Sequence, residues 1–406
     1  MEVIIIGGGA AGFFTAVNAA NLNPEYKITI LEKSNKLLAK VLVSGGGRCN
    51  VTHACFDNGL LVKSYPRGEK ELRSAFSKFS TTDTINWFKD QGINLKTEAD
   101  GRMFPESNTS ETIANCLIET AKNLGVKIKT NISVKEIIVN SDKTFTLKTD
   151  TDYNPTCTKL IIASGGNPKS ENYNWLRKLG HTIVPPVPSL FTFNISDENL
   201  TKLMGISVPN AKVQIVNTKL QTEGPLLITH WGLSGPAVLK GSALGARILN
   251  ELNYDFSVKV NWFPNFKEEQ LKELFNEQRT TNPSKIILSN SPIEIPKRLW
   301  EYFVSKAEIT EATRWADASK KQLNALVGIL VSDIYNVKGK TTFKEEFVTC
   351  GGISLKEIDF ATMQSKIVPN LYFAGEVLDI DGITGGFNFQ SAWTTGWIAA
   401  NGISLD

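Results

Sequence analysis

The first 31 residues alternate between short apolar runs and an alanine-rich segment. Residues 2–6 (EVIII) are apolar and β-branched, which is typical of a strand buried on both faces. Residues 10–22 predict a helix that ends before Pro24. Residues 27–31 (KITIL) predict a second buried strand, which Glu32 closes. This order predicts a strand–helix–strand unit and therefore a parallel sheet.

The rest of the chain divides into two ends of one character and a middle of another. The prolines of residues 183–190 (IVPPVPSL) mark a domain boundary. We expect a glycine-containing loop over 40–50, helices over 69–91, 109–124, 267–279, 297–308 and 385–402, strands over 159–163 and 370–375, a hairpin of 133–139 with 143–149, and β-like runs within 190–260 and 341–349. The pattern predicts a discontinuous α/β domain that carries an insert.

The composition is that of an ordinary globular protein. With 406 residues the chain exceeds the usual size of one core, so two or three domains are expected. A formal net charge of +3 gives no reason to expect a nucleic acid or an anionic membrane as partner. Five cysteines without CxxC spacing argue against a disulfide framework or a metal site and favour a reducing cytoplasm. The apolar N-terminus lacks a basic segment, and no stretch reaches the length of a membrane span.

The turn after the first strand has the spacing G-x-G-x-x-G, at Gly7, Gly9 and Gly12. The first glycine permits a tight turn, the second lets a pyrophosphate approach the backbone, and the third allows close packing of helix on strand. The helix N-terminus then offers free N–H groups to the phosphates. Glu32 stands where a carboxylate accepts hydrogen bonds from ribose hydroxyls. The turn predicts a dinucleotide site but does not separate FAD from NAD.

Glycines near the other end of the chain favour FAD. Residues 371–376 (LYFAGE) predict a strand that closes on Gly375 and Glu376. Gly385 and Gly386 would start the last helix, and a helix N-terminus at the flavin pyrimidine edge stabilises the negative charge of the reduced ring. A carboxylate at Glu376 or Asp379 is a candidate partner of the ribityl hydroxyls.

A third glycine segment, residues 44–50 (SGGGRCN), permits close approach of the backbone to a ligand. Arg48 is a candidate partner of a phosphate or a substrate carboxylate. Cys49 is better interpreted as a small buried residue than as a nucleophile, because no nearby group would activate it. Asn50 suits either a ligand contact or a turn.

Together these segments resemble the HI0933-like (YhiN-like) family of NAD(P)/FAD-dependent oxidoreductases, which includes BaiN-like bile-acid reductases and aminoacetone oxidase-like flavoproteins. The similar segments, in order, are IIIGGGAAG (4–12), SGGGRCNVT (44–52), GRMFPES (101–107), ASGG (163–166), PSL (188–190), THWGLSGPAVL (229–239), TCGGISLKEID (349–359) and TMQSKIVPNLYFAGEVLDIDGITGGFNFQSAW (362–393). The chain departs from the family at His53, where Asn is usual, and in a shorter segment after ASGG.

The resemblance implies a Rossmann-like FAD-binding domain with inserted β-barrel-like and helical domains. We therefore expect an FAD-binding domain over 1–189 and 350–406, a β-barrel-like domain over 190–260 and 336–349, and a helical domain over 261–335. The motifs and the resemblance together predict that FAD is bound by Gly7, Gly9, Ala10, Ala11, Gly12, Glu32, Lys33, Gly45, Gly46, Arg48, Cys49, Asn50, Val134, Ser164, Gly165, Gly375, Glu376, Asp379, Gly385, Gly386, Phe387 and Asn388.

The reaction is less closely specified than the cofactor. Only one G-x-G-x-x-G unit is present, so a separate nicotinamide domain is not expected. We expect a reductase of a small or medium organic substrate that uses transiently bound NADPH or NADH. The alternatives are an amine or ketone oxidase that produces peroxide, and a flavin-binding interaction or RNA-associated protein. His230 and His53 are the candidate acid–base residues. The sequence does not indicate the substrate or the oligomeric state.

Overall fold

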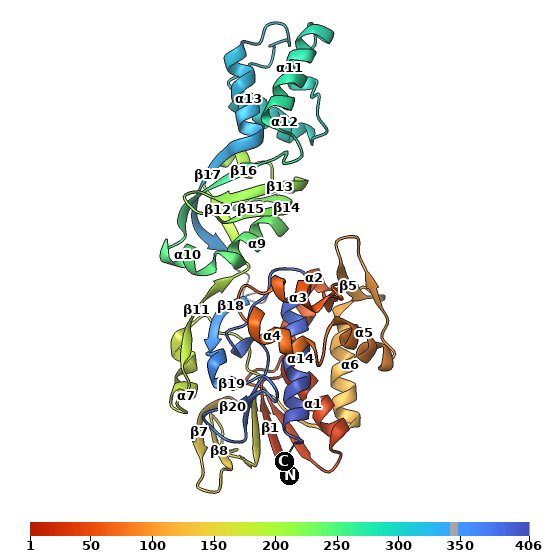
Figure 1. Ribbon diagram of the computed structural model, residues 1–406, viewed down its shortest axis with the longest axis vertical. Helices are drawn as coiled ribbons and strands as arrows, with labels where there is room; N and C mark the ends of the chain where they lie inside the picture. The colour runs from red at the N-terminus through yellow and green to blue at the C-terminus, as the bar shows by residue number, and fades with distance from the viewer. Residues whose placement is uncertain (342–347, 406) are drawn as a thin grey trace. The chain divides into compact units, whose positions relative to one another are not determined.

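The computed structural model describes residues 1–341 and 348–405, and the chain forms two compact units (Figure 1). Unit 1 comprises Met1–Ser189 and Phe343–Asp406, and unit 2 comprises Leu190–Thr342. Each unit has its own cluster of buried apolar side chains. The first and last parts of the chain therefore share one core, as the glycine motifs at both ends predict.

A seven-stranded sheet forms the centre of unit 1, in the order β19-β20-β21-β10-β1-β2-β6. Its parallel strands are β1 (Glu2–Ile6), β2 (Lys27–Leu31), β6 (Lys127–Lys129), β10 (Lys159–Ile162) and β21 (Leu371–Phe373). The antiparallel strands β20 (Gln364–Ser365) and β19 (Ile358–Asp359) extend one side. Apolar side chains on both faces of β1, β2, β10 and β21 are buried, which explains the continuous apolar runs in the sequence.

Two helices from opposite ends of the chain pack against each other in unit 1. They are α1 (Ala10–Leu22) and α14 (Phe387–Gly402), and most of their residues are buried. A Cβ at Gly396 would lie 3.0 Å from the Ala11 carbonyl oxygen, so the two backbones approach closely. The helix α6 (Ser110–Asn123) also packs against α1 (Figure 1).

Two expectations about local structure are wrong. The single helix expected over 69–91 is two helices, α4 (Glu69–Phe76) and α5 (Thr81–Asp90), because Ser80 begins the second. The Asp83 carboxylate accepts the Ser80 N–H at 2.7 Å, as in a capping box. The segment 40–50 is not only a loop: α2 (Ala39–Gly47) covers most of it and loses helical geometry at Ser44 to Gly46.

Smaller elements complete unit 1. They are α3 (Asn58–Leu61), α7 (Asn174–Arg177), the sheet of β3 (Thr52–His53), β5 (Arg102–Pro105) and β4 (Leu95–Thr97), the sheet of β7 (Val134–Val139), β8 (Phe145–Thr149) and β9 (Thr156–Cys157), and the pair β11 (Ile183–Ser189) and β18 (Val348–Ile353). The expected hairpin of 133–149 is thus confirmed as β7 and β8.

Unit 2 contains a closed barrel and a group of helices on one core. The barrel order is β12 (Thr192–Ile195), β15 (Gly232–Ser234), β14 (Gln221–Thr229), β13 (Ser207–Ile215), β16 (Asp255–Asn261) and β17 (Asp333–Thr341). The helices are α8 (Glu198–Thr201), α9 (Pro236–Leu244), α10 (Ala246–Glu251), α11 (Glu268–Thr281), α12 (Lys297–Lys306) and α13 (Lys320–Ser332). Buried Trp262, Trp300 and Trp315 join the barrel and the helices in one core.

The predicted class, a discontinuous Rossmann-like domain with β-barrel and helical inserts, is confirmed. The exact division into domains stays a prediction. Val348 and Thr349 were expected in the insert, but they belong to β18 and pair with β11 of unit 1. Residues 342–347 of the expected β-like run 341–349 lie outside the described residues.

Candidate functional site

The predicted binding motifs follow four neighbouring parallel strands of unit 1. The glycine turn follows β1, Glu32 follows β2, the ASGG segment follows β10, and η5 (Gly375–Val377) follows β21. Because these strands are parallel, their carboxyl ends lie along the same edge of the sheet. Ligands of open α/β sheets bind at this edge, so the fold brings the motifs to one candidate site.

Gly7 and Gly12 pack too closely for any side chain. Gly7 has a φ of +118°, and a Cβ there would lie 2.2 Å from the Ala163 carbonyl oxygen. A Cβ at Gly12 would lie 1.9 Å from the Gly7 carbonyl oxygen, so α1 starts directly against the turn. A Cβ at Gly9 would meet no atom of the described residues within 4 Å. Gly9 therefore leaves room for a pyrophosphate before the N-terminus of α1.

Three hydrogen bonds hold the Glu32 carboxylate in place. One oxygen accepts the Gly8 N–H at 2.8 Å, and the other accepts the Ser34 N–H and hydroxyl, each at 2.9 Å. The two oxygens of a carboxylate accept about four hydrogen bonds in all, so one position remains for a ribose hydroxyl. Lys33, the next residue, is exposed.

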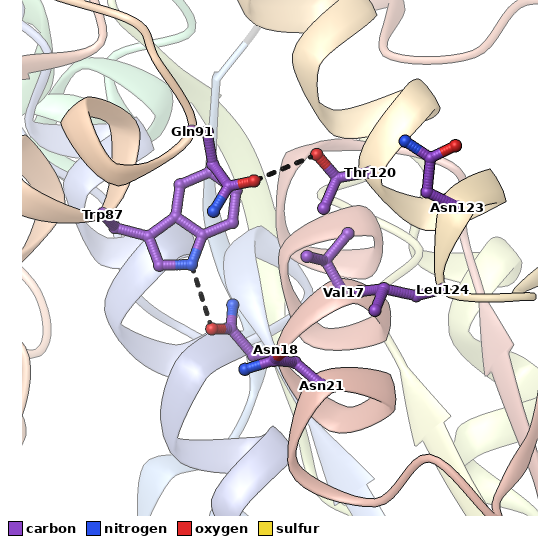
Figure 2. A pocket seen from close by; sticks show the side chains of 8 residues that line it. All are labelled: Val17, Asn18, Asn21, Trp87, Gln91, Thr120, Asn123 and Leu124. Atoms are coloured by element: carbon purple, nitrogen blue, oxygen red, sulfur yellow. Dashed lines mark hydrogen bonds between the residues drawn. The ribbon is translucent and has the colours of Figure 1, made fainter.

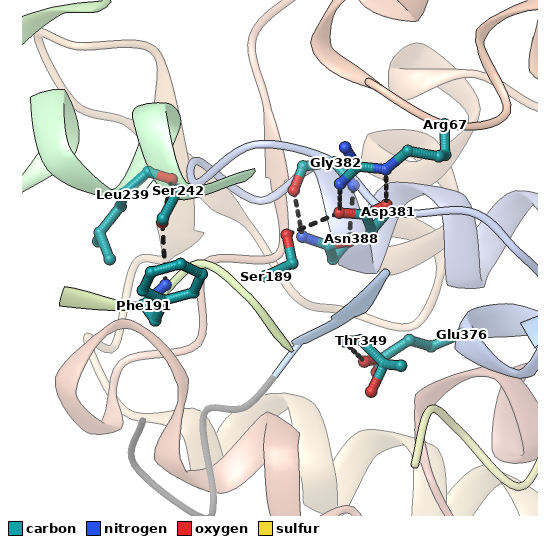
Figure 3. Close-up of polar contacts among 10 residues, drawn as sticks. All are labelled: Arg67, Ser189, Phe191, Leu239, Ser242, Thr349, Glu376, Asp381, Gly382 and Asn388. Atoms are coloured by element: carbon teal, nitrogen blue, oxygen red, sulfur yellow. Dashed lines mark hydrogen bonds and ion pairs between the residues drawn. The ribbon is translucent and has the colours of Figure 1, made fainter. Parts of the chain in front are cut away.

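Glu376, a predicted partner of the ribityl hydroxyls, is held at both of its carboxylate oxygens. Its Oε1 accepts the Thr349 N–H at 2.8 Å, and its Oε2 pairs with Lys40 Nζ at 2.5 Å (Figure 3 shows Thr349 and Glu376). A Cβ at Gly166 would lie 2.7 Å from both Glu376 Oε1 and Thr349, so the ASGG segment lies against this carboxylate. Lys40 was missed in the sequence because 336 residues separate it from its partner.

The turn before α14 is braced from two sides. With its amide oxygen toward Gly386, Asn50 accepts the Gly386 N–H at 3.0 Å and donates to the Thr52 carbonyl at 3.0 Å. Asn388 accepts the Gly382 N–H at 2.9 Å and donates to the Gly382 carbonyl at 3.0 Å. The SGGGRCN and GGFN segments therefore form one structure, although they stand at opposite ends of the chain.

Arg48 and Cys49 have local partners in unit 1. The Arg48 guanidinium pairs with Glu98 at 2.6 Å and lies 4.0 Å from the centre of the Phe104 ring. Cys49 is fully buried, and burial raises the pKa of its thiol to about 12. A thiol with this pKa stays protonated at neutral pH, which agrees with its interpretation as a packing residue. The neighbouring Gly46 is exposed, and a Cβ there would contact no described residue.

A buried ion pair lies beside the turn before α14. Arg67 Nε donates to Asp381 Oδ1 at 2.5 Å, Arg67 Nη2 also contacts the carboxylate, and the Ser189 hydroxyl donates to it at 2.7 Å (Figure 3). The Asp381 side chain is fully buried, and that of Arg67 is 14% exposed. The pair fixes the loop that leads to Gly385 and Gly386. This pairing was not predicted from the sequence, because 314 residues separate its partners.

The two candidate histidines lie in different units. His53 Nδ1 lies 3.0 Å from the Gly385 carbonyl oxygen, and its ring stacks on Phe387 with centroids 4.6 Å apart. Its Nε2 lies against Gly101, because a Cβ there would come within 2.6 Å of it. His230 is exposed in the two-residue turn between β14 and β15 of unit 2, beside Trp231.

The remaining predicted residues lie around the same sheet edge. Ala10 and Ala11 begin α1, Ser164 and Gly165 follow β10, and Asp379 follows η5. Val134 begins β7, two residues after Ile132, whose N–H donates to the Glu32 carbonyl oxygen at 2.9 Å. No group of three or more His, Cys, Asp or Glu side chains in the described part of the chain has the arrangement of a metal site.

The residues at the sheet edge fit FAD. Open space at Gly9 before α1 suits the pyrophosphate, Glu32 suits the adenosine ribose, and Glu376 suits the ribityl hydroxyls. FAD bound there supplies hydride transfer through its flavin ring, while the protein supplies position and electrostatics. Within residues 1–341 and 348–405, no helix is both long and apolar enough to cross a membrane.

Comparison with known proteins places the chain in a family. The family described as HI0933-like protein Rossmann domain matches residues 1–402. A ribosomal RNA dihydrouridine synthase of Haemophilus influenzae is 31% identical over 99% of this chain and 98% of its own length. The Escherichia coli protein of the same name is 30% identical, over 98% and 97%. A 3-dehydro-bile acid delta(4,6)-reductase of Clostridium scindens is 27% identical, over 97% of both chains.

Solved structures agree on the fold. A 3-ketosteroid delta1-dehydrogenase of Sterolibacterium denitrificans has a TM-score of 0.52 at 12% identity, over 99% of both chains. A 3-ketosteroid-delta4-(5alpha)-dehydrogenase of Rhodococcus jostii RHA1 has a TM-score of 0.51 at 13% identity, over 98% of this chain and 97% of its own. At such identities the likeness concerns the fold alone. The family match over residues 1–402 and the geometry of the sheet edge lead to one conclusion: the chain belongs to the HI0933-like family and is an FAD-dependent oxidoreductase.

Proposed function

We propose that the chain is a reductase that uses NADPH or NADH to saturate a carbon–carbon double bond conjugated to a carbonyl group. In this reaction the nicotinamide gives a hydride, solvent gives a proton, and the double bond takes up both. The expected activity, a reductase of an organic substrate, is thereby narrowed to one class of bond. The substrate of the proposed enzyme is uridine in ribosomal RNA.

The names of the relatives carry this proposal. Dihydrouridine is uridine with its C5–C6 double bond saturated, and that bond is conjugated to the C4 carbonyl. A delta(4,6)-reductase of a 3-dehydro bile acid acts on double bonds conjugated to the C3 carbonyl. The two kinds of relative, each matched over nearly its whole length, thus share one class of bond. Uridine is favoured because the relatives named for it are 31% and 30% identical to this chain.

A ribosomal RNA substrate differs from the partner expected from composition. The net charge of +3 gave no reason to expect a nucleic acid as partner, and the proposed substrate departs from that untested expectation. A modest charge is compatible with an enzyme that reads one unpaired base, because single-stranded RNA is recognised largely by stacking and by hydrogen bonds to base edges. A bile-acid-like enone is the second candidate substrate, supported by the relative at 27% identity.

The nicotinamide is proposed to bind transiently. The chain has one G-x-G-x-x-G turn, and the resident cofactor takes it.

Saturation of the double bond also needs a proton donor for the carbon that does not receive the hydride. His53 has Gly385 on one ring nitrogen and Gly101 against the other, which favours a bracing role. His230 is exposed, so a substrate can reach it, and it remains the proposed acid. We expect His230→Asn to lower kcat and change its pH profile, whereas His53→Asn should change neither strongly.

Product analysis tests the proposal. The FAD-loaded protein is incubated with NADPH or NADH and either a uridine-containing ribosomal RNA transcript or a 3-oxo-Δ4 bile acid, and the digested products are weighed by mass spectrometry. Two hydrogen atoms added to uridine are the expected result. Reduction of the bile acid alone would assign the second substrate. Peroxide from an amine or a ketone, without reduction of either double bond, would favour the oxidase alternative and contradict the proposal.

A further inference from the structure

A pocket of about 280 Å³ lies in unit 1 among the last turns of α1, α5 and α6 (Figure 2). It is distinct from the cofactor site, because it lies at the opposite end of α1 from the glycine turn. Gly9 precedes α1 and Asn21 is its penultimate residue. A rise of about 1.5 Å per residue therefore separates the two by roughly 18 Å along the helix.

The polar lining of this pocket is uncharged and comes from all three helices. Asn18 and Asn21 belong to α1, Gln91 follows α5, and Thr120 and Asn123 belong to α6. No Asp, Glu, Lys or Arg occurs among the described residues that line it. A charged ligand would therefore find no counterion in the lining, and a neutral polar ligand is favoured.

Some of these amides are fixed and others are free to bind a ligand. Asn18 accepts the Trp87 indole N–H at 3.1 Å and donates to the Phe14 carbonyl at 2.7 Å. The side chains of Asn21 and Asn123 are exposed at the pocket mouth and have no hydrogen-bond partner within the part of the chain that the structure describes, so a ligand would replace water at these amides. Each of these amides offers two donors and an acceptor. The pocket can thus pair with a ligand edge that carries both kinds of group.

The other walls of the pocket are apolar. In Figure 2 the Trp87 indole lies on one side and the side chains of Val17 and Leu124 on the other, with amides above and below. Trp87 packs on Phe14 with ring centroids 4.6 Å apart, so its indole is held in place. Two apolar walls with polar groups at the edges suit a flat ring, which contacts the walls with its faces and the amides with its edge.

We propose that this pocket is a second binding site, which takes an uncharged planar heterocycle of the pyrimidine-base type. A heterocycle of this type is neutral, has apolar faces and carries N–H and C=O groups at its edge. These properties match the lining in charge, shape and hydrogen bonding. The inference does not depend on which reaction the flavin performs.

Calorimetric titration of the FAD-saturated protein with uridine tests this site. We expect uridine to bind, and Asn21→Leu or Asn123→Leu to weaken the binding at least tenfold, because each removes hydrogen bonds to the base. Asn115→Leu is the matched control: Asn115 is an exposed residue of the same helix α6 outside the pocket, and its replacement should leave the affinity unchanged. Unaltered melting temperatures would show that all three variants fold.

Three results would overturn the proposal. They are the absence of uridine binding at millimolar concentration, equal affinities in Asn21→Leu, Asn123→Leu and the wild type, and binding of glucose as tight as that of uridine. Uridine bound only at a reaction site would give the second result. Since the titration measures binding and not turnover, a failed reductase assay leaves its outcome unaffected.

Discussion

The two units of the chain differ in which segments their ion pairs connect. In unit 1, Arg67 pairs with Asp381 and Lys40 pairs with Glu376, across 314 and 336 residues. In unit 2, Lys306 Nζ contacts Asp333 at 2.7 Å across only 27 residues, and the Asp333 carboxylate also accepts the Tyr335 hydroxyl.

This difference predicts two roles: the ion pairs of unit 1 position cofactor motifs, whereas the ion pair of unit 2 stabilises the insert. The pairs of unit 1 hold segments that carry cofactor motifs, so their loss should weaken FAD binding. The pair of unit 2 joins α12 to the start of β17, so its loss should affect only the stability of the insert. The following predictions test that distinction, from the largest expected effect to the smallest.

Gly12→Ala should have the largest effect. The new Cβ would lie 1.9 Å from the Gly7 carbonyl oxygen, and a backbone atom at that distance cannot move without distorting the turn. We expect a loss of about 3 kcal/mol in the free energy of unfolding and no retained FAD. Urea unfolding and the flavin spectrum of the purified protein measure the two effects.

Gly9→Val is the matched control for this turn. A Cβ there meets no described atom within 4 Å, so unfolding should change little while FAD is lost. If Gly12→Ala unfolded like the wild type, or if Gly9→Val kept its flavin, the assignment of the turn would be wrong.

Arg67→Met should have the next largest effect. The change leaves the fully buried Asp381 carboxylate without its cation, which costs about 3 kcal/mol. Because Asp381 precedes the loop to Gly385, we also expect FAD affinity to fall about tenfold. Urea unfolding and FAD titration of the apoprotein check both effects, and unchanged FAD affinity would remove the link between this ion pair and the cofactor.

Lys306→Met tests the same chemistry in unit 2. The Lys306 side chain is 30% exposed and Asp333 is 4% exposed, so we expect a smaller loss, about 2 kcal/mol, in the free energy of unfolding. FAD affinity should stay the same, because the pair touches no cofactor motif. A drop in FAD affinity as large as that of Arg67→Met would contradict the distinction between the units.

Lys40→Met should show the reverse pattern. Lys40 is 42% exposed, so solvent screens its pair with Glu376 and stability should change by less than about 1 kcal/mol. FAD should nevertheless bind about fivefold more weakly, because the Glu376 side chain loses the partner that fixes its Oε2. FAD titration measures this, with Lys89→Met as control, because Lys89 is an exposed lysine of α5 outside the cofactor motifs. Equal affinities of the two variants would count against a positioning role for Lys40.

His181 predicts a small dependence of stability on pH. Burial lowers the pKa of His181, and the hydrogen bond that its ring Nδ1 donates to the Glu357 carboxylate opposes this shift only in part. Below the unfolded pKa of 6.5 the unfolded chain binds a proton that the folded chain does not, so stability should fall as the pH drops through that value. His181→Asn should flatten this part of the curve of unfolding free energy against pH, and an unchanged slope in the variant would assign the effect elsewhere.

Much of unit 1 could be predicted because its requirements are local. The turn leaves no space for a Cβ at positions 7 and 12, so both residues must be glycine. Strands that are buried on both faces require continuous apolar residues. The start of α5 at Ser80 also has a local signal, the capping box with Asp83. Apolar residues continue at helical spacing across Ser80, so the break between α4 and α5 was not predicted.

The barrel closure and the bracing ion pairs depend on contacts between residues that are far apart in the sequence. Closure of the barrel depends on the pairing of β12 with β17, which lie about 140 residues apart. The partners Lys40 and Glu376 are likewise separated by most of the chain, and neither residue type at its position indicates the other. Only the folded chain brings such partners together. The cofactor motifs could therefore be predicted from the sequence, whereas the residues that brace them could not.

An anaerobic single turnover tests the central claim most directly. The FAD-loaded protein is reduced with one equivalent of NADPH or NADH and then mixed with uridine-containing ribosomal RNA in the absence of oxygen. We predict that the flavin is bleached by the nicotinamide, that its colour returns on addition of the RNA, and that one dihydrouridine forms per flavin reoxidised. A flavin that neither nicotinamide reduces, or that stays reduced with RNA and with the bile-acid enone until oxygen is admitted, would contradict the account.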